Sequence, residues 1–188
     1  MKMTTEDQEL ITEDLPVTGK GKIMTALDLC CGLSGWADGF IATGWRVIGI
    51  DLKDLSADYP GEFVQADLLT WEGWRSIPAD LVLASPPCEE FSRCSMPRTR
   101  KLNPPEPSLA LVNRCREIAM ELQVPIVLEN VRGAQTWLGR SAMNCGLIHL
   151  WGDIPALVPT CHRAKRAVIP FELAAHFARC FKNYRKVC

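Results

Sequence analysis

The chain has 188 residues, of which 47% are hydrophobic and 23% are charged, and its formal net charge is −1. These values are typical of one globular domain with its own core, and they exclude a uniformly basic nucleic-acid-binding protein. No apolar run is long enough to cross a membrane and the first residues lack a signal-peptide core, so we expect a cytoplasmic protein with no membrane contact.

Residues 1–20 are acidic and polar, and we expect them to form a flexible tail before a single domain at 21–188. Short apolar runs predict strands at 23–29, 45–50, 62–65, 80–84, 125–128 and 146–151. Helical spacing and capping signals predict helices at 36–43, around 69–75, at 109–122 and at 170–184. Strands that alternate with helices predict an α/β fold with a doubly wound, mostly parallel sheet.

The nine cysteines are an odd number and form no paired C-x-x-C framework. In a cytoplasmic chain this pattern indicates reduced thiols, most of them buried. The spacing of Cys145, His149, Cys161 and His162 matches no standard zinc pattern, so we expect no metal site.

Glycines and acidic residues lie at or just after the ends of the first three predicted strands. In D-L-C-C-G-L-S-G, Gly32 and Gly35 would let the backbone approach a ligand at the start of a helix. Asp28 favours a cationic ligand without phosphates, such as S-adenosylmethionine. Asp51 is placed to accept from ribose hydroxyls, and Asp67 from an adenine amino group. Each acid alone could equally be a surface residue or a helix cap.

Two further segments follow the fourth and fifth predicted strands. In S-P-P-C-E-E-F-S, Pro86 and Pro87 end the strand and hold Cys88 in a rigid turn, at the edge where open α/β sheets bind ligands. A packed structural cysteine is the alternative. In L-E-N-V, Glu129 and Asn130 follow a buried strand. A carboxylate there is costly unless it is paired, so Glu129 either caps the next helix or belongs to a site.

Taken in order, these segments resemble the cytosine-5 DNA methyltransferases. That family carries D-L-F-x-G-x-G-G-F, an acidic residue after the second strand, P-P-C-Q-x-F-S and E-N-V. This chain has D-L-C-C-G-L-S-G-W, I-G-I-D-L, Q-A-D-L, S-P-P-C-E-E-F-S and L-E-N-V between residues 26 and 132. Residues 167–178 faintly resemble the family's last motif, and the compact size is similar to short members carried by bacteriophages. The resemblance implies a Rossmann-like, S-adenosylmethionine-dependent methyltransferase fold.

The resemblance implies that Cys88 attacks carbon 6 of a flipped-out cytosine, that Glu129 holds N3 and supplies a proton, and that carbon 5 takes the methyl group of S-adenosylmethionine. Asn130 and Pro87 complete the implied catalytic set. A following helix N-terminus and nearby arginines would lower the pKa of Cys88. The implied cofactor-binding residues are Asp28, Leu29, Cys30, Gly32, Ser34, Gly35, Trp36, Asp51, Leu52, Asp67, Leu68, Pro86 and Val168.

Two basic segments could bind DNA. Residues 93–116 carry six basic residues and one acidic residue, and residues 161–188 carry seven and one. The proline-rich segment 92–108 is long for a loop and predicts a lid that closes over the flipped base. The candidate DNA-binding residues are Ser92, Arg93, Arg98, Arg100, Lys101, Arg140, Arg163 and Arg166.

The chain departs from the family in three places. Cys30 stands where the family has Phe, so the aromatic contact with the cofactor is either missing or supplied by Trp36. No Q-x-R-x-R motif is present, and Arg140, Arg163 or Arg166 would replace it. Too few residues follow Asn130 for a separate target-recognition domain. Recognition would then use a short loop, a homodimer or a separate recognition subunit, or else the substrate is not duplex DNA.

Two other functions stay open at this point. The first is an RNA cytosine-5 methyltransferase, and the second is a non-catalytic nucleic-acid-binding or regulatory partner derived from such an enzyme. A phage-encoded enzyme would work in the bacterial cytoplasm, where it could protect DNA in restriction–modification or prepare cytosine for further modification. The target sequence and the oligomeric state do not follow from the residues.

Overall fold

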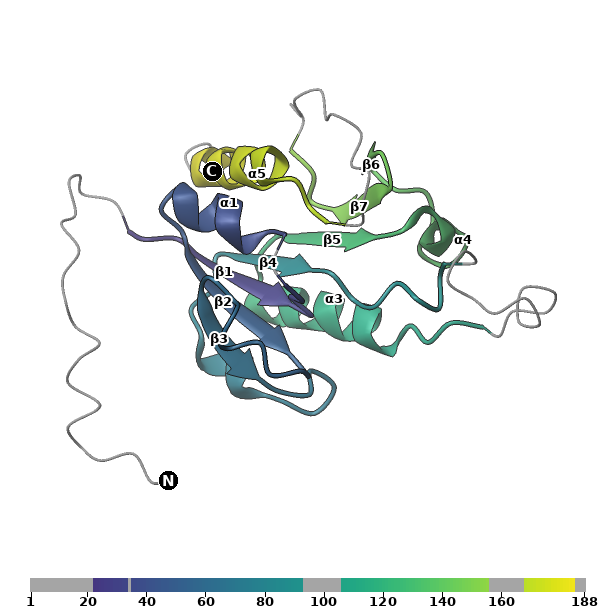
Figure 1. The fold of residues 1–188 in the computed structure, drawn as a ribbon, viewed down its shortest axis with the longest axis horizontal. Helices are drawn as coiled ribbons and strands as arrows, with labels where there is room; N and C mark the ends of the chain where they lie inside the picture. The colour runs from purple at the N-terminus through teal and green to yellow at the C-terminus, as the bar shows by residue number, and fades with distance from the viewer. Residues whose placement is uncertain (1–21, 34, 93–105, 156–167, 185–188) are drawn as a thin grey trace.

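The computed structural model describes residues 22–33, 35–92, 106–155 and 168–184, which build a seven-stranded sheet with helices on both faces (Figure 1). The strands are β1 (Thr25–Leu29), β2 (Arg46–Asp51), β3 (Glu62–Gln65), β4 (Leu81–Ala84), β5 (Ile126–Asn130), β6 (Met143–Cys145) and β7 (Ile148–Gly152). The helices are α1 (Ala37–Ala42), α3 (Ala110–Leu122), α4 (Gln135–Leu138) and α5 (Phe171–Tyr184), with 3₁₀ turns η2 (Gly73–Ser76) and η3 (Arg132–Ala134).

The strand order is β3-β2-β1-β4-β5-β7-β6, and β1 to β5 run parallel. The chain moves outward from β1 to β3 and then returns to place β4 on the other side of β1. This reversal is the switch point of a doubly wound sheet, so the predicted fold class is confirmed. The predicted sixth strand is β7, which pairs antiparallel with β5, and β6 is an additional strand that the apolar pattern did not indicate.

The core has two layers, one on each face of the sheet. Helices α1 and α5 cover one face, and α3 covers the other (Figure 1). The helical spacing predicted for α3 is confirmed, because Val112, Cys115 and Ala119 are all buried against the sheet. The layers hold together through burial of apolar strand residues, which are almost completely shielded from solvent along β1 and β4.

Helix α5 packs closely on α1. A Cβ atom added at Gly39 of α1 would lie 2.5 Å from Cβ of Ala174 in α5, so only glycine allows this approach. The indole Nε1 of Trp45 donates to the Ala178 carbonyl across 3.1 Å, which fixes the C-terminal half of α5 beside the start of β2. Residues that are far apart in the sequence therefore pack together on one face of the sheet.

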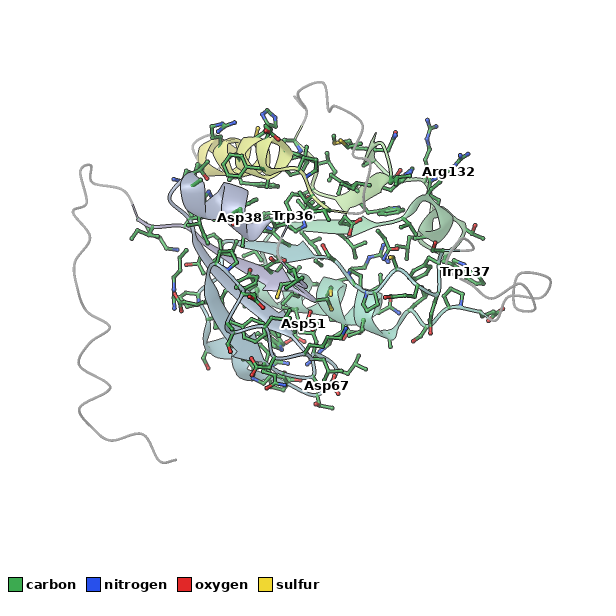
Figure 2. The ribbon with its side chains drawn as sticks, in the orientation of Figure 1. Trp36, Asp38, Asp51, Asp67, Arg132 and Trp137 are labelled. Atoms are coloured by element: carbon green, nitrogen blue, oxygen red, sulfur yellow. The ribbon has the colours of Figure 1, made fainter. Side chains whose placement is uncertain are left out.

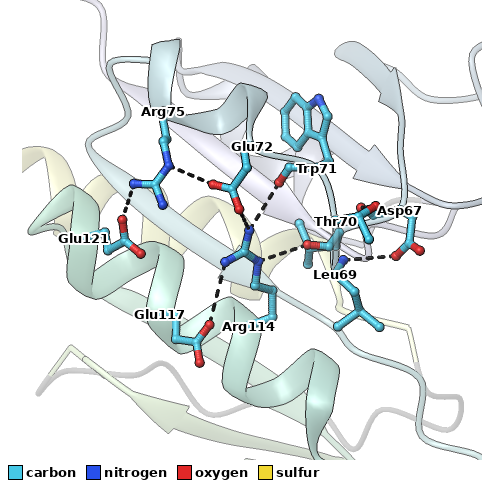
Figure 3. Close-up of polar contacts among 10 residues, drawn as sticks. Asp67, Leu69, Thr70, Trp71, Glu72, Arg75, Arg114, Glu117 and Glu121 are labelled. Carbon is cyan, nitrogen blue, oxygen red and sulfur yellow. Dashed lines mark hydrogen bonds and ion pairs between the residues drawn. The ribbon is translucent and has the colours of Figure 1, made fainter.

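The helix expected around residues 69–75 is instead a turn followed by the 3₁₀ turn η2. Ile77 precedes Pro78 and is extended, as the residue before a proline usually is, so the turn cannot continue as an α-helix. The segment is held by Arg114 of α3, which donates to the Leu68 carbonyl across 3.1 Å and to the Trp71 carbonyl across 3.4 Å (Figure 3). Arg114 also pairs with Glu72 (Figure 3).

One cysteine corrects the expectation of reduced thiols. Cys145 of β6 is disulfide-bonded, whereas Cys30, Cys31, Cys88 and Cys115 are free. Among the described residues no group of three or more His, Cys, Asp and Glu side chains could hold a metal ion. The same residues include no helix with both the length and the apolar character needed to span a membrane.

Candidate active site

The loops that follow β1, β2, β4 and β5 begin at one edge of the sheet, where the strand register brings them together. Leu29 lies beside both Ile50 and Ala84, and Ala84 lies beside Leu128. One hydrogen bond continues this alignment beyond β4: Ser85 N donates to the Leu29 carbonyl across 3.0 Å. The segments that carry the predicted site residues therefore converge, as expected for the carboxyl ends of parallel strands.

Cys88 sits in a turn just beyond β4. Phe91 N donates to the Cys88 carbonyl across 3.1 Å, which closes the turn, and no helix follows it directly. The thiol is free and half-buried. Burial raises its pKa above the ordinary 9.0, and the negative charges of Glu89 and Glu129 raise it further. This corrects the expectation of a lowered pKa, which relied on a helix N-terminus that the described residues do not supply.

Asn130 holds this turn in place. It is completely buried at the end of β5, and its Nδ2 donates to the Pro86 carbonyl across 3.0 Å, while its Oδ1 accepts from Val131 N across 2.9 Å. Both polar atoms of the Asn130 side-chain amide are therefore bonded to main-chain groups. Asn130 therefore positions the Pro86–Cys88 turn. Pro86 is buried, and Pro87 is exposed beside Cys88.

Glu129 lies one residue earlier, paired with Leu150 of β7. Burial raises its pKa from 4.5 to about 7, although a hydrogen bond from Ser85 opposes the shift. The carboxyl group is thus partly protonated at neutral pH. Because Glu129 also acts on the pKa of Cys88, the two groups belong to one site at the ends of neighbouring strands.

The loop after β1 is hydrogen-bonded to the end of β2. Gly32 N donates to Asp51 Oδ2 across 3.0 Å, and Asp51 Oδ1 accepts from Lys53 N across 3.0 Å. Gly32 has a φ of +52°, and a Cβ atom added there would meet nothing within 4 Å. Cys30 shares this left-handed conformation with a φ of 52°. The backbone of this loop therefore faces open space beside Asp51.

Two residues predicted for the cofactor lie elsewhere in the packing. Gly35 is packed against the segment that leads into α5, since an added Cβ would lie 2.6 Å from Cβ of Ile169. Trp36 is only 1% exposed and packs on Phe40 and Phe177, so it corrects the expectation of an aromatic contact with the cofactor. The sequence did not indicate this burial, because it depends on Phe177 of α5, far along the chain.

Asp28 lies near the end of β1, as predicted, and is completely buried. Its Oδ2 accepts from the Tyr59 hydroxyl across 2.9 Å, and its Oδ1 is buried with no hydrogen-bond partner among the described residues. Burial raises the pKa of Asp28 to about 8; the Tyr59 bond opposes this, and the charge of Asp51 adds to it. Asp28 is therefore mostly neutral near pH 7, although its pKa would fall if a cation approached.

Exposed apolar side chains follow β2 and β3. Leu52 is 69% exposed directly after Asp51, and Leu69 is 47% exposed after Asp67. Asp67 is itself exposed and forms a turn in which its Oδ1 accepts from Leu69 N across 3.0 Å (Figure 3). Figure 2 shows Asp51 and Asp67 on the same part of the molecule. Leu69 is a residue that the sequence pattern did not single out.

The remaining predicted residues divide into three groups. Leu29 and Leu68 are buried, so they could offer only backbone atoms, while Val168 and Arg140 are exposed. Ser92 is half-buried and already has an interaction partner. The residues that lie outside the described part of the chain, together with most of the proposed lid, are Ser34, Arg93, Arg98, Arg100, Lys101, Cys161, His162, Arg163 and Arg166.

The comparisons with known proteins are limited to solved structures. No protein-family model matches the chain, and no curated protein matches its sequence. One match is described as a DNA modification methyltransferase encoded within an E. coli prophage, with 22% identity, a TM-score of 0.44, and coverage of 59% of this chain and 33% of that chain. An Entamoeba histolytica methyltransferase matches at 18% identity and a TM-score of 0.47, covering 63% and 41%.

A third match is the glycopeptide N-methyltransferase MtfA complexed with S-adenosylmethionine, at 15% identity and a TM-score of 0.39, covering 74% of this chain and 63% of that one. The chain thus spans about a third to two thirds of the length of these matched proteins.

Proposed function

We propose that this chain transfers a methyl group from S-adenosylmethionine to carbon 5 of cytosine in DNA. The observation that supports this most directly is the pairing of Cys88 and Glu129 at the ends of β4 and β5, close enough for the charge of Glu129 to raise the pKa of Cys88. A thiol nucleophile beside a carboxylic acid with a pKa of about 7 suits covalent attack on a ring that must also accept a proton.

The groups at the ends of β1 and β2 fit S-adenosylmethionine. Each carboxylate oxygen of Asp51 accepts one backbone N–H and retains capacity for a ribose hydroxyl. The open side of Gly32 lets a ligand approach the main chain. The exposed side chains of Leu52 and Leu69 offer apolar surface to an adenine ring. When bound, this cofactor would supply an electrophilic methyl group.

The proposed reaction begins with the thiolate of Cys88. Its sulfur forms a bond to carbon 6 of cytosine, which turns carbon 5 into an enamine-like nucleophile that takes the methyl group. Glu129 in its protonated form donates to N3 as negative charge develops on the ring. Water then takes the proton from carbon 5, the bond between sulfur and carbon 6 breaks to release the Cys88 thiolate by β-elimination, and N3 returns its proton to Glu129, which restores the aromatic ring.

The base must leave any stacked duplex before Cys88 can reach carbon 6. The raised pKa predicts that the Cys88 thiol has low reactivity in the free protein. With its pKa raised by burial, Cys88 is mostly protonated at neutral pH, and it forms thiolate more readily once Glu129 is neutral. The free protein would thus protect its nucleophile until Glu129 holds a proton and the base is in place.

The test is methyl transfer from labelled S-adenosylmethionine to unmethylated DNA, with nucleosides identified by mass spectrometry. Wild type is compared with Cys88→Ala and with Cys180→Ala, which removes another half-buried free thiol, on α5. We expect 5-methylcytosine from wild type and Cys180→Ala only. A parallel reaction with RNA separates the two nucleic acids, and methylation by Cys88→Ala would refute the proposed nucleophile.

A second assay detects the covalent step itself. DNA with 5-fluorocytosine cannot lose a proton from carbon 5, so the adduct with Cys88 should persist. We expect a denaturant-resistant protein–DNA species that requires S-adenosylmethionine and that Cys88→Ala does not form. If wild type binds S-adenosylmethionine but forms neither product with DNA or RNA, the function as a methyltransferase of cytosine is wrong.

A further inference from the structure

The segment after β5 contacts the turn that carries the proposed nucleophile. A side chain at Gly133 of η3 would overlap the carbonyl oxygen of Phe91, so η3 lies directly against the turn begun by Cys88. Helix α4 continues from η3. Helix α4 therefore begins close to the turn that carries Cys88.

Helix α4 presents an aromatic ring with two arginines around it. Trp137 is 41% exposed, and Arg132 and Arg140 are both exposed. Figure 2 shows Trp137 and Arg132 at the same end of the molecule. Within the described part of the chain, neither guanidinium forms a hydrogen bond or an ion pair, and residues 131–152 contain no Asp or Glu. The surface formed by Arg132, Trp137 and Arg140 is thus positive as well as aromatic.

This surface is held in a fixed position. Trp151 Nε1 donates to the Gly139 carbonyl across 2.9 Å, directly after α4. Ser141 N donates to Gln135 Oε1 across 3.2 Å, and the Ser141 hydroxyl lies 2.9 Å from Nδ1 of His149 in β7. These bonds fix both ends of α4 to one another and to the sheet. An exposed tryptophan on so short and well-anchored a helix loses little freedom when a ligand covers it.

We propose that Trp137, Arg132 and Arg140 bind an unpaired nucleotide next to the target base, with its base stacked on Trp137 and its phosphates held by the arginines. Stacking on Trp137 needs a base with at least one free face. In a duplex, the neighbouring base pairs cover both faces of each base. The preferred substrate is therefore single-stranded nucleic acid or a locally opened duplex. Placing the target itself at Cys88 rests on the proposed function, but the stacking site does not.

The test is equilibrium binding, measured by fluorescence anisotropy at one fixed salt concentration. A labelled single strand of DNA is compared with the same sequence as a blunt duplex, for wild type, Trp137→Ala and Trp137→Phe. Phe171→Ala is the matched control, because Phe171 is 49% exposed on α5. A single strand of RNA with the same sequence shows whether the site accepts either sugar.

We expect Trp137→Ala to weaken single-strand binding by about 5- to 150-fold, the range measured when one stacked base loses its aromatic partner. Trp137→Phe should retain most of the affinity, and Phe171→Ala all of it. Replacing Arg132 and Arg140 with Gln should reduce the salt dependence, by about 0.7 in the logarithmic slope for each phosphate that is no longer neutralised. A salt series measures that slope, and thermal unfolding establishes that each variant is folded.

Three results would overturn the inference: wild-type affinity in Trp137→Ala, an equal loss in Phe171→Ala, or an equal loss of affinity for the blunt duplex. The assay needs neither cofactor nor catalysis and can be repeated in Cys88→Ala. Intact methyl transfer without a Trp137 effect refutes the stacking site alone. A Trp137 effect without any methyl transfer refutes the proposed function alone.

Discussion

The side-chain amide of Asn130 donates to the main-chain carbonyl of Pro86 across 3.0 Å, which ties the end of β5 to the turn that carries Cys88. Both residues are buried, so water cannot replace this bond. The end of β5 and the Cys88 turn are therefore coupled by a bond from a side chain to the main chain, and not by the reacting groups themselves.

Asn130→Ala should leave the Pro86 carbonyl without its donor. We expect the free energy of unfolding to fall by about 1–3 kcal/mol, the usual effect of orphaning a buried polar group. We also expect kcat for methyl transfer to fall while the Kd for S-adenosylmethionine stays unchanged. Denaturant unfolding, steady-state kinetics and calorimetry measure the three quantities. Asn113→Ala, at an exposed position of α3, is the control and should change none of them.

The pH dependence of methyl transfer should show the raised pKa values. The reactive form needs a Cys88 thiolate and a protonated Glu129. Because the pKa of Glu129, about 7, lies below that of Cys88, kcat/KM should rise up to about pH 7. It should then stay level and fall only above pH 9. Glu129→Gln should be slower and should lose the break near pH 7. A break that persists in Glu129→Gln would assign it to another group.

Asp28 should make the protein less stable as the pH rises. Its pKa is 3.8 when unfolded and about 8 when folded, so the folded state binds the extra proton between these values. Its contribution to stability is therefore lost progressively from about pH 4 to pH 8. Asp28→Asn cannot ionise, and at pH 8 we expect it to be about 1–3 kcal/mol more stable than wild type. Urea unfolding at pH 5 and pH 8 measures this.

Asp80→Asn provides the contrast for that experiment. Asp80 is also buried, but its carboxylate accepts from Lys22 Nζ across 3.0 Å and from Thr25 N across 2.9 Å. The same chemical change should therefore destabilise the protein at this position. Equal gains in stability at both positions would show that the effect does not come from the burial of Asp28.

Arg114→Ala should weaken cofactor binding from a distance. Arg114 is 13% exposed and holds the main chain at Leu68 and Trp71, the segment that presents Asp67 and Leu69 (Figure 3). We expect a loss of about 1–3 kcal/mol in unfolding free energy and a weaker Kd for S-adenosylmethionine. Calorimetry measures the Kd. Arg116→Ala, exposed on the same helix, should behave as wild type; a similar loss there would indicate a general charge effect.

Substitutions at Gly35 and Gly32 should separate packing from ligand binding. Gly35→Ala forces Ile169 away, because its Cβ would lie 2.6 Å from Cβ and 2.7 Å from N of that residue. We expect a loss of about 1–3 kcal/mol in stability. Gly32→Ala meets no atom but keeps a strained φ of +52°, which costs about 1–2 kcal/mol. Only Gly32→Ala should lower cofactor affinity beyond its effect on folding, as thermal unfolding and calorimetry would show.

Much of the fold could be predicted because the strands are short apolar runs that end at polar or glycine residues. The predicted strand at 62–65 is β3 itself, and the helix predicted at 109–122 differs from α3 by one residue. The helix predicted around residues 69–75 was wrong because Pro78 and a buried Trp74 favour a tighter turn over a helix. Strand β6 was missed because its three residues are too few to show a period.

The candidate site could be predicted only as far as it depends on position along a strand. Asp51, Cys88 and Glu129 lie where the strand ends place them. Burial depends on distant segments, so the sequence could not show that α5 encloses Trp36 or that Cys88 has a raised pKa. Trp137 was overlooked because one aromatic residue in a polar stretch carries no periodic signal, although its flanking arginines were visible.

The contact between Gly35 and Ile169 has a consequence for how the protein is made. The loop that would face the cofactor rests on a residue more than a hundred positions later, so it leaves the ribosome well before its packing partner. The hydrogen bond from Trp45 likewise cannot form until Ala178 has been synthesised. A nascent chain stalled before α5 would contain β1 to β5 without the packing of α5 on α1. It should not yet bind S-adenosylmethionine. Binding competence would then appear late and all at once, as α5 docks.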